Sequence, residues 1–416
     1  MNKHVKKDVF IMKKKLIMLF LIVLSLCACE GEVGINESLV LNEQTLEQLQ
    51  LELPYEKNVY KPLNFENQKA VWFTVMDFQK TLNGRTQEEF TDDISAVFTK
   101  IKDTGFNTVY VHVRPYNDAY YKSDIFPLSE SCTGEFDPFE IILEKAHTLN
   151  LSVHAWINPL RCQTTEQIKK TDSKYKIRQW YDDSDKNGKY IVEVDGRWYL
   201  NPAYDEVREY ISDGVRELAD NYHIDGVHID DYFYPTQKES FDKAAFELSG
   251  NSDLKSWRTE NINLMVQGIY NASKDGNSDV LFGISPQGNI EINMSSLYAD
   301  VITWCSESGY CDYIVPQLYY GFKNESKPFN ETLLEWKNIV TCEDVRLVAG
   351  ICMYKIGSED KWAGSGKSEW IEDKNIPSRQ ISAVIENGVS VAVYSVESLF
   401  EEKNSGECSL IAKLLK

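Results

Sequence analysis

The segment richest in reactive groups is Asp225-Gly-Val-His-Ile-Asp230-Asp231-Tyr-Phe-Tyr-Pro235, in which a short apolar run ends in two adjacent carboxylates. Paired carboxylates can transfer protons and stabilise developing positive charge, the two tasks of glycosidic bond hydrolysis. Because successive side chains of a strand point to opposite sides, only one of the pair can face straight into a common site. We predict Asp230 as nucleophile or electrostatic stabiliser, and Asp231 as a residue that orients substrate or, after a bend at the strand end, acts as acid/base. The alternative is that one of them only caps the following turn, and Asp225 is predicted to be a turn residue.

Eight apolar runs rich in β-branched and aromatic residues must position these groups. The runs are nearly continuous in apolar residues, as expected of strands covered on both faces. Amphipathic helices separate them: Thr86 and Glu89 form a capping box, Gly105 ends that helix, and Asp137 and Asn201, each before a proline, are predicted N-caps. The runs are Ala70–Phe78, Thr108–Pro115, Ser152–Pro159, Gly226–Tyr234, Leu281–Gly288, Tyr313–Tyr320, Arg346–Tyr354 and Ser390–Val396.

This alternation predicts an α/β fold, a (β/α)₈ TIM barrel over residues 69–416. An open doubly wound sheet would alternate in the same way, but eight strands without a Gly-rich phosphate loop favour the closed barrel. Alternating runs around Asp195-Gly196 predict a β-hairpin insertion between strands three and four. The segment from Pro235 to Asp279 predicts a helical insertion after strand four, at the rim of the barrel.

In such a barrel the carboxyl ends of the strands meet at one face, where the site is expected. Carboxylates, amides and arginines there could bind sugar hydroxyls, and flat rings could cover pyranose faces. Arg114 and Arg161 could equally be ion-pair partners, and the aromatic residues could equally belong to the barrel core. The predicted substrate-binding residues are Asp77, His112, Arg114, His154, Trp156, Asn158, Arg161, His228, Tyr232, Gln317, Tyr319 and Glu397.

Three of these residues, His112, His154 and His228, also suggest a zinc site, since they lie on neighbouring strands two, three and four. Metallo-hydrolase barrels usually begin with a His-x-His strand, which this sequence lacks. Single histidines at strand ends more often form hydrogen bonds with substrate or carboxylates. We therefore predict no metal and no cofactor.

Composition and charge narrow the partners. With 43% hydrophobic residues the chain can bury a large core. The net charge is −20; residues 1–28 carry six Lys and one Asp, so the remainder carries −25. A polyanion of this strength repels nucleic acid and anionic lipid headgroups, which favours a neutral partner. Cys305 and Cys311 could pair, but buried free thiols are favoured.

The amino-terminal residues predict export and a lipid anchor. Lys13, Lys14 and Lys15 precede an apolar run, Leu16–Leu26, that is too short to span a bilayer. Leu26-Cys27-Ala28-Cys29 is typical of a lipoprotein cleavage site, with Cys29 lipidated. We predict a signal peptide over 1–28, a tether over 29–68, and a position on the extracytoplasmic face of the cell membrane. An ordinary secretory signal is the alternative, and Met12 is an alternative start.

Seven sequence strings together resemble a known family, the glycosyl-hydrolase-like family 10, also called domain of unknown function 187. The resemblance covers about residues 70–396 and implies a (β/α)₈ barrel with glycoside hydrolase activity. One bacterial branch cleaves peptidoglycan glycan strands stripped of their stem peptides, and many members are lipoproteins. The strings are Ala70-Val71-Trp72, Val113-Arg114-Pro115-Tyr116-Asn117-Asp118-Ala119, Val153-His154-Ala155-Trp156-Ile157-Asn158-Pro159, Tyr199-Leu200-Asn201-Pro202, Asp225-Gly226-Val227-His228-Ile229-Asp230-Asp231-Tyr232, Gly283-Ile284-Ser285-Pro286 and Pro316-Gln317-Leu318-Tyr319.

The segment around Asp230 is also similar to the Asp-Gly-x-Asp-x-Asp-x-Glu strand of chitinase-like family 18 glycosidases. Here Tyr232 stands where that pattern has its acid/base Glu, and His228 where it has its middle Asp. A partner acid from another strand is therefore expected: Asp118, inside a family string, is preferred to Glu397. The sequence predicts a glycoside hydrolase acting on a polysaccharide or peptidoglycan glycan strand; the alternative is a non-catalytic glycan-binding lipoprotein.

Overall fold

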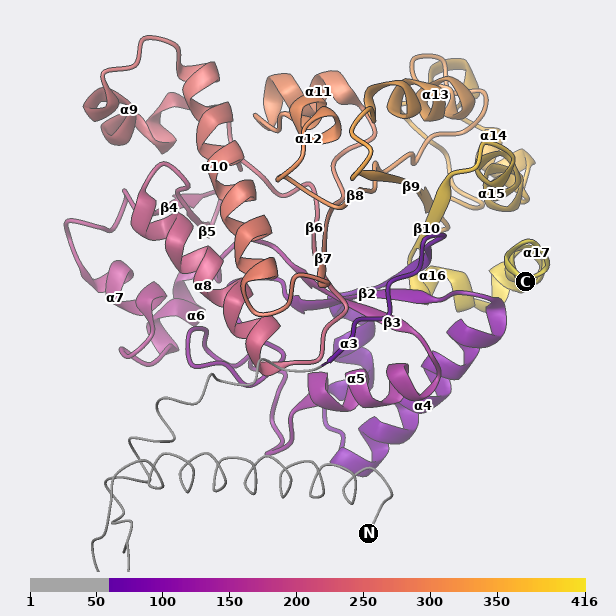
Figure 1. Cartoon of the computed structure of the whole chain (residues 1–416), viewed down its shortest axis with the longest axis horizontal. Coiled ribbons are helices and arrows are strands. Elements are labelled where there is room, and N and C mark those ends of the chain that lie inside the picture. Colours follow the sequence, from indigo (N-terminus) through magenta and orange to yellow (C-terminus); the bar gives the residue numbers. More distant parts are fainter. Residues whose placement is uncertain (1–59) are drawn as a thin grey trace, which may run out of the picture. The chain divides into compact units, whose positions relative to one another are not determined.

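Each of the eight predicted apolar runs contains a strand in the computed structural model, which describes residues 60–416 (Figure 1). The strands are parallel and close into a barrel in the order β1-β10-β9-β8-β7-β6-β3-β2, so the predicted (β/α)₈ fold is confirmed. The signal peptide, Cys29 and most of the predicted tether lie outside the described residues. The barrel strands are β1 Lys69–Phe73, β2 Thr108–Arg114, β3 Ser152–Ile157, β6 Gly226–Ile229, β7 Leu281–Ile284, β8 Tyr313–Ile314, β9 Arg346–Cys352 and β10 Ser390–Tyr394.

Helices cover the outside of the barrel. The capping box of Thr86 and Glu89 begins α4, Gly105 ends it at φ 103°, and Asp137 caps α5, as predicted. Asn201 was wrongly predicted as a cap: its side chain donates to Lys189 O, and Tyr204 precedes the helix instead. The longer helices are α3 Val75–Leu82, α4 Gln87–Thr104, α5 Pro138–Thr148, α8 Asp205–Asn221, α10 Leu254–Asp275, α13 Phe329–Ile339, α15 Ile376–Glu386 and α17 Ser405–Leu415.

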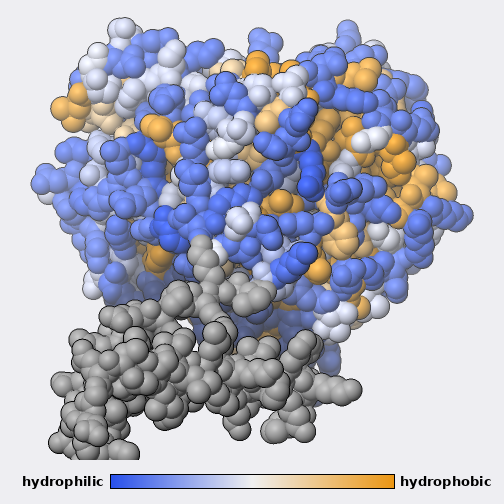
Figure 2. Space-filling model, viewed as in Figure 1, coloured by the Kyte–Doolittle hydropathy of each residue, from blue (hydrophilic) through white to orange (hydrophobic). Residues whose placement is uncertain are grey.

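Shorter helices fill the connections between these elements. They are α6 Thr165–Lys170, α7 Lys176–Asp182, α9 Lys243–Ser249, α11 Ile290–Ser296, α12 Val301–Ser306, α14 Glu369–Glu372 and α16 Val396–Phe400, with 3₁₀ turns η1 Glu239–Phe241, η2 Gly364–Gly366 and η3 Glu402–Asn404. None of the helices within residues 60–416 is long and apolar enough to cross a bilayer. The face seen in Figure 2 is mostly hydrophilic, with scattered hydrophobic residues.

Both predicted insertions are present. Strands β4 Ile191–Val194 and β5 Arg197–Leu200 form an antiparallel hairpin, and Asp195 and Gly196 both have positive φ in its two-residue turn. The helical insertion after β6 consists of η1 and α9. Asp242, between these two elements, forms a fully buried ion pair with Arg258 of α10, which holds the insertion against that helix. Helix α10 itself does not lie on the rim: it packs along α8 as a covering helix (Figure 1).

Aromatic rings and histidines fill the barrel interior. Trp72 Nε1 donates to His228 Nε2 at 3.2 Å, and the Tyr313 hydroxyl lies 3.1 Å from His228 Nδ1 and 2.6 Å from His154 Nδ1. Two glycines make room for these rings: a Cβ on Gly226 would lie 2.4 Å from His154 Nδ1, and one on Gly283 would lie 1.9 Å from Tyr313 Cζ. The interior below the site is therefore a packed core, not a channel.

The end of the barrel formed by the amino ends of the strands, which we call the foot, is covered by residues 60–68. Tyr60 Oη and Leu63 N both donate to Asp225 Oδ1 at 2.6 Å. Asp225 Oδ2 accepts from Val153 N at 2.6 Å and lies 3.0 Å from His147 Nε2. Asp225 is thus a buried junction that holds the incoming chain, which is more than the turn residue that was predicted.

The seven cysteines within residues 60–416 are all free thiols. Cys305 and Cys311 are both buried, and burial raises the pKa of each thiol. The interpretation of this pair as buried free thiols is confirmed.

Candidate active site

Asp230 lies directly after β6, at the carboxyl ends of the barrel strands, a face that we call the mouth. Trp156 Nε1 donates to its Oδ2 at 3.1 Å, and Asn158 Nδ2 donates to its Oδ1 at 2.5 Å. These donors come from β3 and the residue just beyond it, because β3 and β6 pair in register with Trp156 beside His228. Trp156, Asn158 and Asp230 are all buried. The two donors fix the orientation of the carboxyl group before any substrate binds.

His112 supports both of these donors. Its Nε2 lies 2.9 Å from Asn158 Oδ1, and its ring stacks on Trp156 with centroids 3.6 Å apart and an interplanar angle of 8°. Burial lowers the pKa of His112 to about 3, so the ring is neutral. Nε2 must then carry the proton, because Asn158 presents its carbonyl oxygen to His112 while its amide donates to Asp230. His112 is therefore a positioning residue.

The pKa values of the two adjacent carboxyl groups are both raised. Burial, followed by the charge of Asp231, raises the pKa of Asp230 to about 7, although Asn158 and Arg161 act in the opposite direction. Burial also raises the pKa of Asp231, against hydrogen bonds from the side chains of Gln317 and Gln287. Because the two groups interact, they titrate as a pair. Such a pair can hold one proton and one negative charge at the same time, as acid/base chemistry requires.

Arg161 forms one side of the mouth together with two tyrosines. Its guanidinium carbon lies 4.0 Å from the ring centroid of Tyr232 and 4.8 Å from that of Tyr116. The guanidinium carbon of Arg197, from the hairpin insertion, lies 4.2 Å from the centroid of the same Tyr116 ring. Tyr232 is 44% exposed, so this stack of cations and rings presents a flat face and N–H donors to solvent.

Three tyrosines line another side, and we call them the tyrosine wall: Tyr319, Tyr354 and Tyr394. Their ring centroids lie 5.9 to 6.1 Å apart. Burial raises the pKa of Tyr394 to about 12, and the charges of Asp230 and Asp231 act in the same direction, so the carboxylates are close enough to be felt at the wall. Aromatic faces beside carboxylates are suited to a pyranose ring.

Gln317 connects the carboxylates to the tyrosine wall. Its Nε2 donates to Ser285 O at 3.2 Å, and its backbone carbonyl accepts from Tyr319 N at 2.8 Å. Gln287, Tyr354 and Tyr394 were not among the predicted binding residues. Their positions at the ends of three predicted strands could have identified them.

Asp118 has other neighbours than the Asp230 pair. It is buried, its Oδ1 accepts from Tyr116 N at 3.2 Å, and the cation that acts on it is Arg197. Burial raises its pKa. The Tyr116 ring lies between the two arginines: Arg161, which acts on Asp230, and Arg197, which acts on Asp118.

Asp77 and Glu397 lie in helices and not, as predicted, at strand ends. Strand β1 ends at Phe73 because Thr74 caps α3, and Asp77 completes the capping box through bonds to Thr74 N and Oγ1 at 2.8 Å. Glu397 lies in the first turn of α16, where its backbone N–H bonds to Asp77. Burial raises the pKa of Asp77 to about 6. The two acids are therefore neighbours, held by the ends of two short helices.

Three other predicted binding residues have their polar groups away from the mouth. His154 and His228 belong to the barrel interior, and burial lowers the pKa of His154 to about 4 and that of His228 well below its ordinary value. Arg114 is buried beside α8, with its guanidinium carbon 4.3 Å from the Phe126 ring. Within residues 60–416 no group of three His, Cys, Asp or Glu side chains could hold a metal ion, so the alternative zinc site is not formed there.

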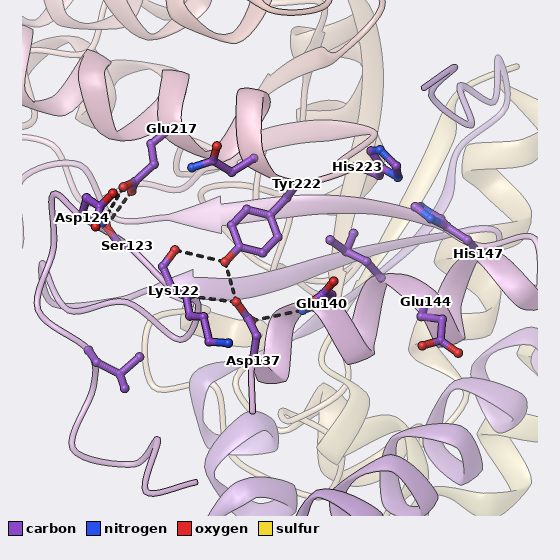
Figure 3. Close-up of a pocket in the computed structure, with 13 residues that line it drawn as sticks. Lys122, Ser123, Asp124, Asp137, Glu140, Glu144, His147, Glu217, Tyr222 and His223 are labelled. Carbon is purple, nitrogen blue, oxygen red and sulfur yellow. Dashed lines mark hydrogen bonds between the residues drawn. The ribbon is translucent and has the colours of Figure 1, made fainter. Parts of the chain in front are cut away.

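A pocket of about 770 Å³ lies elsewhere, between α5 and α8 (Figure 3). Its polar groups already bind one another: Tyr222 Oη donates to Asp137 Oδ2 at 2.5 Å, and Glu217 accepts from Ser123 Oγ at 2.6 Å. Neither Asp230 nor Asp231 lines this pocket. Its size alone does not make it the active site, because the paired carboxylates with raised pKa values are at the mouth.

Comparisons with known proteins identify the family of the chain. The chain is 30% identical over 346 residues to glycosyl hydrolase YngK of Bacillus subtilis (strain 168), covering 76% of this chain and 66% of that protein. It is 28% identical over 307 residues to glycosyl hydrolase DigH of Escherichia coli (strain K12), covering 66% of this chain and 67% of that protein. The chain thus spans about two thirds of the length of these relatives.

Solved structures share the fold. The glycoside hydrolase domain of PgaB (BpsB) from Bordetella bronchiseptica matches with a TM-score of 0.53 and 12% identity, covering 84% of this chain and 99% of that chain. The catalytic domain of beta-amylase from Paenibacillus polymyxa matches with a TM-score of 0.54 and 10% identity, covering 84% and 98%. The model of the family "Glycosyl hydrolase-like 10" matches residues 67–365. The chain therefore belongs to the glycosyl hydrolase-like 10 family.

Proposed function

We propose that this protein is a glycoside hydrolase that cleaves bacterial cell-wall glycan, in particular peptidoglycan strands lacking stem peptides, or a related surface polysaccharide. One observation carries the proposal: Asp230 is buried, held by Trp156 and Asn158, and adjacent to Asp231 in a mouth lined by aromatic rings. This arrangement supplies an oriented carboxylate, a second carboxyl group with a raised pKa and flat faces for sugar rings.

In the proposed reaction Asp230 acts as the ionised group that stabilises the oxocarbenium-like transition state or attacks the sugar. Its fixed orientation favours this role, since both carboxylate oxygens already have donors. Asp231 is half-buried and acts as acid/base. Asp231 is preferred to Asp118 because Asp118 interacts with Arg197 and Tyr116, whereas Asp231 interacts directly with Asp230.

The choice of substrate rests on chemistry and on resemblance. A chain with a net charge of −25 after residue 28 disfavours nucleic acid as a partner. The family resemblance includes a bacterial branch that acts on peptide-free peptidoglycan. Lipid attachment at Cys29 on the outer side of the membrane, which we also propose, would place the barrel where such glycans occur.

The second candidate is a glycan-binding protein without catalysis. Tyr232, which stands where chitinase-like enzymes have their acid/base Glu, favours this candidate. Tyr232 stacks with Arg161, as a binding residue could, and cannot replace a carboxylic acid as a proton donor near neutral pH because its pKa is raised.

Incubation with defined glycans separates the two candidates. The purified chain is mixed with peptidoglycan lacking stem peptides, with intact peptidoglycan and with chitin oligomers, and the products are analysed by mass spectrometry. New reducing ends from the peptide-free strands, absent with Asp230→Asn, support the hydrolase. Binding to these glycans with no new reducing ends from any of them supports the glycan-binding protein.

A further inference from the structure

The side chain of Trp362 is 90% exposed. All nine tryptophans of the chain lie within residues 60–416, and the other eight are buried or half-buried. A single exposed apolar residue is common on protein surfaces and needs no explanation by itself. What separates Trp362 from such a residue is its position and the rigidity of its support.

Trp362 belongs to the connection between β9 and α14, residues 353–368, which we call the Trp362 loop. The loop leaves the carboxyl end of β9, so it begins at the mouth, on the same face as Asp230. Its second residue is Tyr354 of the tyrosine wall, which is 45% exposed. Two exposed aromatic side chains thus follow one another along a loop that starts beside the catalytic pair.

An ion pair fixes the loop to the mouth. Lys355 Nζ lies 2.8 Å from Asp360 Oδ2 and also donates to Tyr319 O at 2.7 Å. The side chain of Asp360 is almost completely buried, and its Oδ1 accepts from Trp362 N at 3.3 Å. Trp362 is therefore connected through two residues to the backbone of the tyrosine wall.

The loop after β8 supports the other side. Glu325 N donates to Ala363 O at 3.1 Å, and Ser365 N donates to Glu325 Oε2 at 3.0 Å. Two glycines allow this close contact: a Cβ on Gly366 would lie 2.1 Å from Lys323 O, and one on Gly364, at φ +57°, would lie 2.9 Å from Glu325 Cβ. The indole is exposed, but the backbone that carries it is packed on two sides.

From these observations we infer that Trp362 is an outlying sugar-binding platform, on which a pyranose ring of a glycan chain stacks after the chain passes Tyr354. The inference rests on the proposed function, because it extends the same site. A flat ring on a rigid loop offers stacking area with little loss of conformational entropy, which favours binding. An indole stacks on the apolar face of a pyranose ring, which neutral and charged glycans share. The substrate class that this platform selects is a polymer and not a free mono- or disaccharide.

Affinities for glycans of increasing chain length test the platform. In an Asp230→Asn background, which prevents cleavage, affinities are measured for short and long chitin oligomers and for peptide-free glycan strands. Trp362→Ala is expected to weaken binding of the long glycans about three- to tenfold and to affect the shortest oligomers less. Trp362→Phe should restore part of the affinity. Leu248→Ala, which removes an apolar side chain that is 86% exposed on α9, is the matched control and should leave the affinities unchanged.

A second readout is independent of affinity. Because Trp362 is the exposed indole among nine, it is the one that a soluble quencher such as acrylamide reaches first, and a bound long glycan should protect it. The melting temperature of Trp362→Ala should equal that of its parent, since the exposed indole makes little packing contact that the substitution could remove.

Two results would overturn the inference. If long glycans bind and Trp362→Ala binds them as tightly as its parent, with no protection from the quencher, the platform is wrong and the proposed function stands. If the unmodified protein neither binds nor cleaves any of the glycans, the proposed function and the platform both fail.

Discussion

Asn158 Nδ2 donates a hydrogen bond to Asp230 Oδ1 across 2.5 Å, joining the residue after β3 to the residue after β6. This bond lowers the pKa of Asp230, which burial and Asp231 raise. Asn158→Ala should therefore move the pKa of Asp230 further up, and the limb of kcat/KM that requires the ionised carboxylate should move to higher pH. The pH profile of glycan cleavage measures the shift. Asn64→Ala, which removes an exposed amide at the foot, is the control and should leave the profile in place.

Asp230→Asn should reduce kcat by about 10⁴-fold or more, as expected for loss of a nucleophile or of the main charge that stabilises the transition state. The asparagine has nearly the same shape, so glycan binding should survive. Release of reducing ends and a binding isotherm, measured on the same preparation, check both statements. Turnover within tenfold of the parent would remove Asp230 from its assigned role.

The two candidates for the acid/base can be separated by Asp231→Asn and Asp118→Asn. The charge of Asp231 acts on Asp230, whereas Asp118 interacts with Arg197. Asp231→Asn should therefore lower kcat a hundredfold or more, which is the order of general acid catalysis. Asp118→Asn should lower kcat much less. Substrates with a good leaving group need no acid, so they should rescue Asp231→Asn. The reverse ranking of the two variants would identify Asp118 as the acid.

Stability should also report on Asp230. Its pKa is about 7 in the folded chain and 3.8 as the ordinary value, so between about pH 4 and pH 7 the folded state binds more protons than the unfolded state. The free energy of unfolding should therefore fall as pH rises through this window. Asp230→Asn cannot titrate, so its free energy of unfolding should fall less steeply with pH than that of the parent. Urea unfolding at a series of pH values checks the sign, and equal slopes for both proteins would contradict the buried carboxyl.

Gly283→Ala should destabilise the barrel, because the new Cβ would lie 1.9 Å from Tyr313 Cζ and the ring has no free space to move into. Overpacking of this kind costs about 1–3 kcal/mol, and the fixed position of the ring places the expected loss at the upper end. Gly406→Ala is the matched control: a Cβ there meets nothing within 4 Å, and an alanine in α17 should be neutral or slightly stabilising. Thermal or urea unfolding compares the two.

The fold could be predicted from the sequence because the strands, the helix caps and the turns are all specified by short local patterns. The apolar runs, the Thr86 capping box and the Asp195-Gly196 turn each fix a structure within a few residues. Strand ends were less certain, since an apolar run does not show where a helix takes over. Phe78 continues the first run, yet Thr74 caps α3 four residues earlier.

The site could be predicted only in part, because the type of a residue does not show whether its side chain lies at the mouth or in the barrel interior. Asp230 and Trp156 do meet at the mouth, but His228, two residues before Asp230, points into the barrel interior. Whether a polar side chain faces substrate or fills the core depends on the register between strands. Trp362 was missed for a different reason: it lies in a loop without apolar periodicity, where only the structure shows exposure and support.

The hydrogen bonds between Asp225 and the segment at Tyr60 and Leu63 fix where the chain enters the barrel, at the end opposite the mouth. A lipid at Cys29, as proposed above, would therefore be connected to the barrel at the foot, and the mouth would not be the point of attachment. Thirty residues lie between Cys29 and Tyr60, which sets a maximum reach of roughly 100 Å when fully extended. With that attachment the barrel would reach glycan only within a layer of bounded thickness above the membrane.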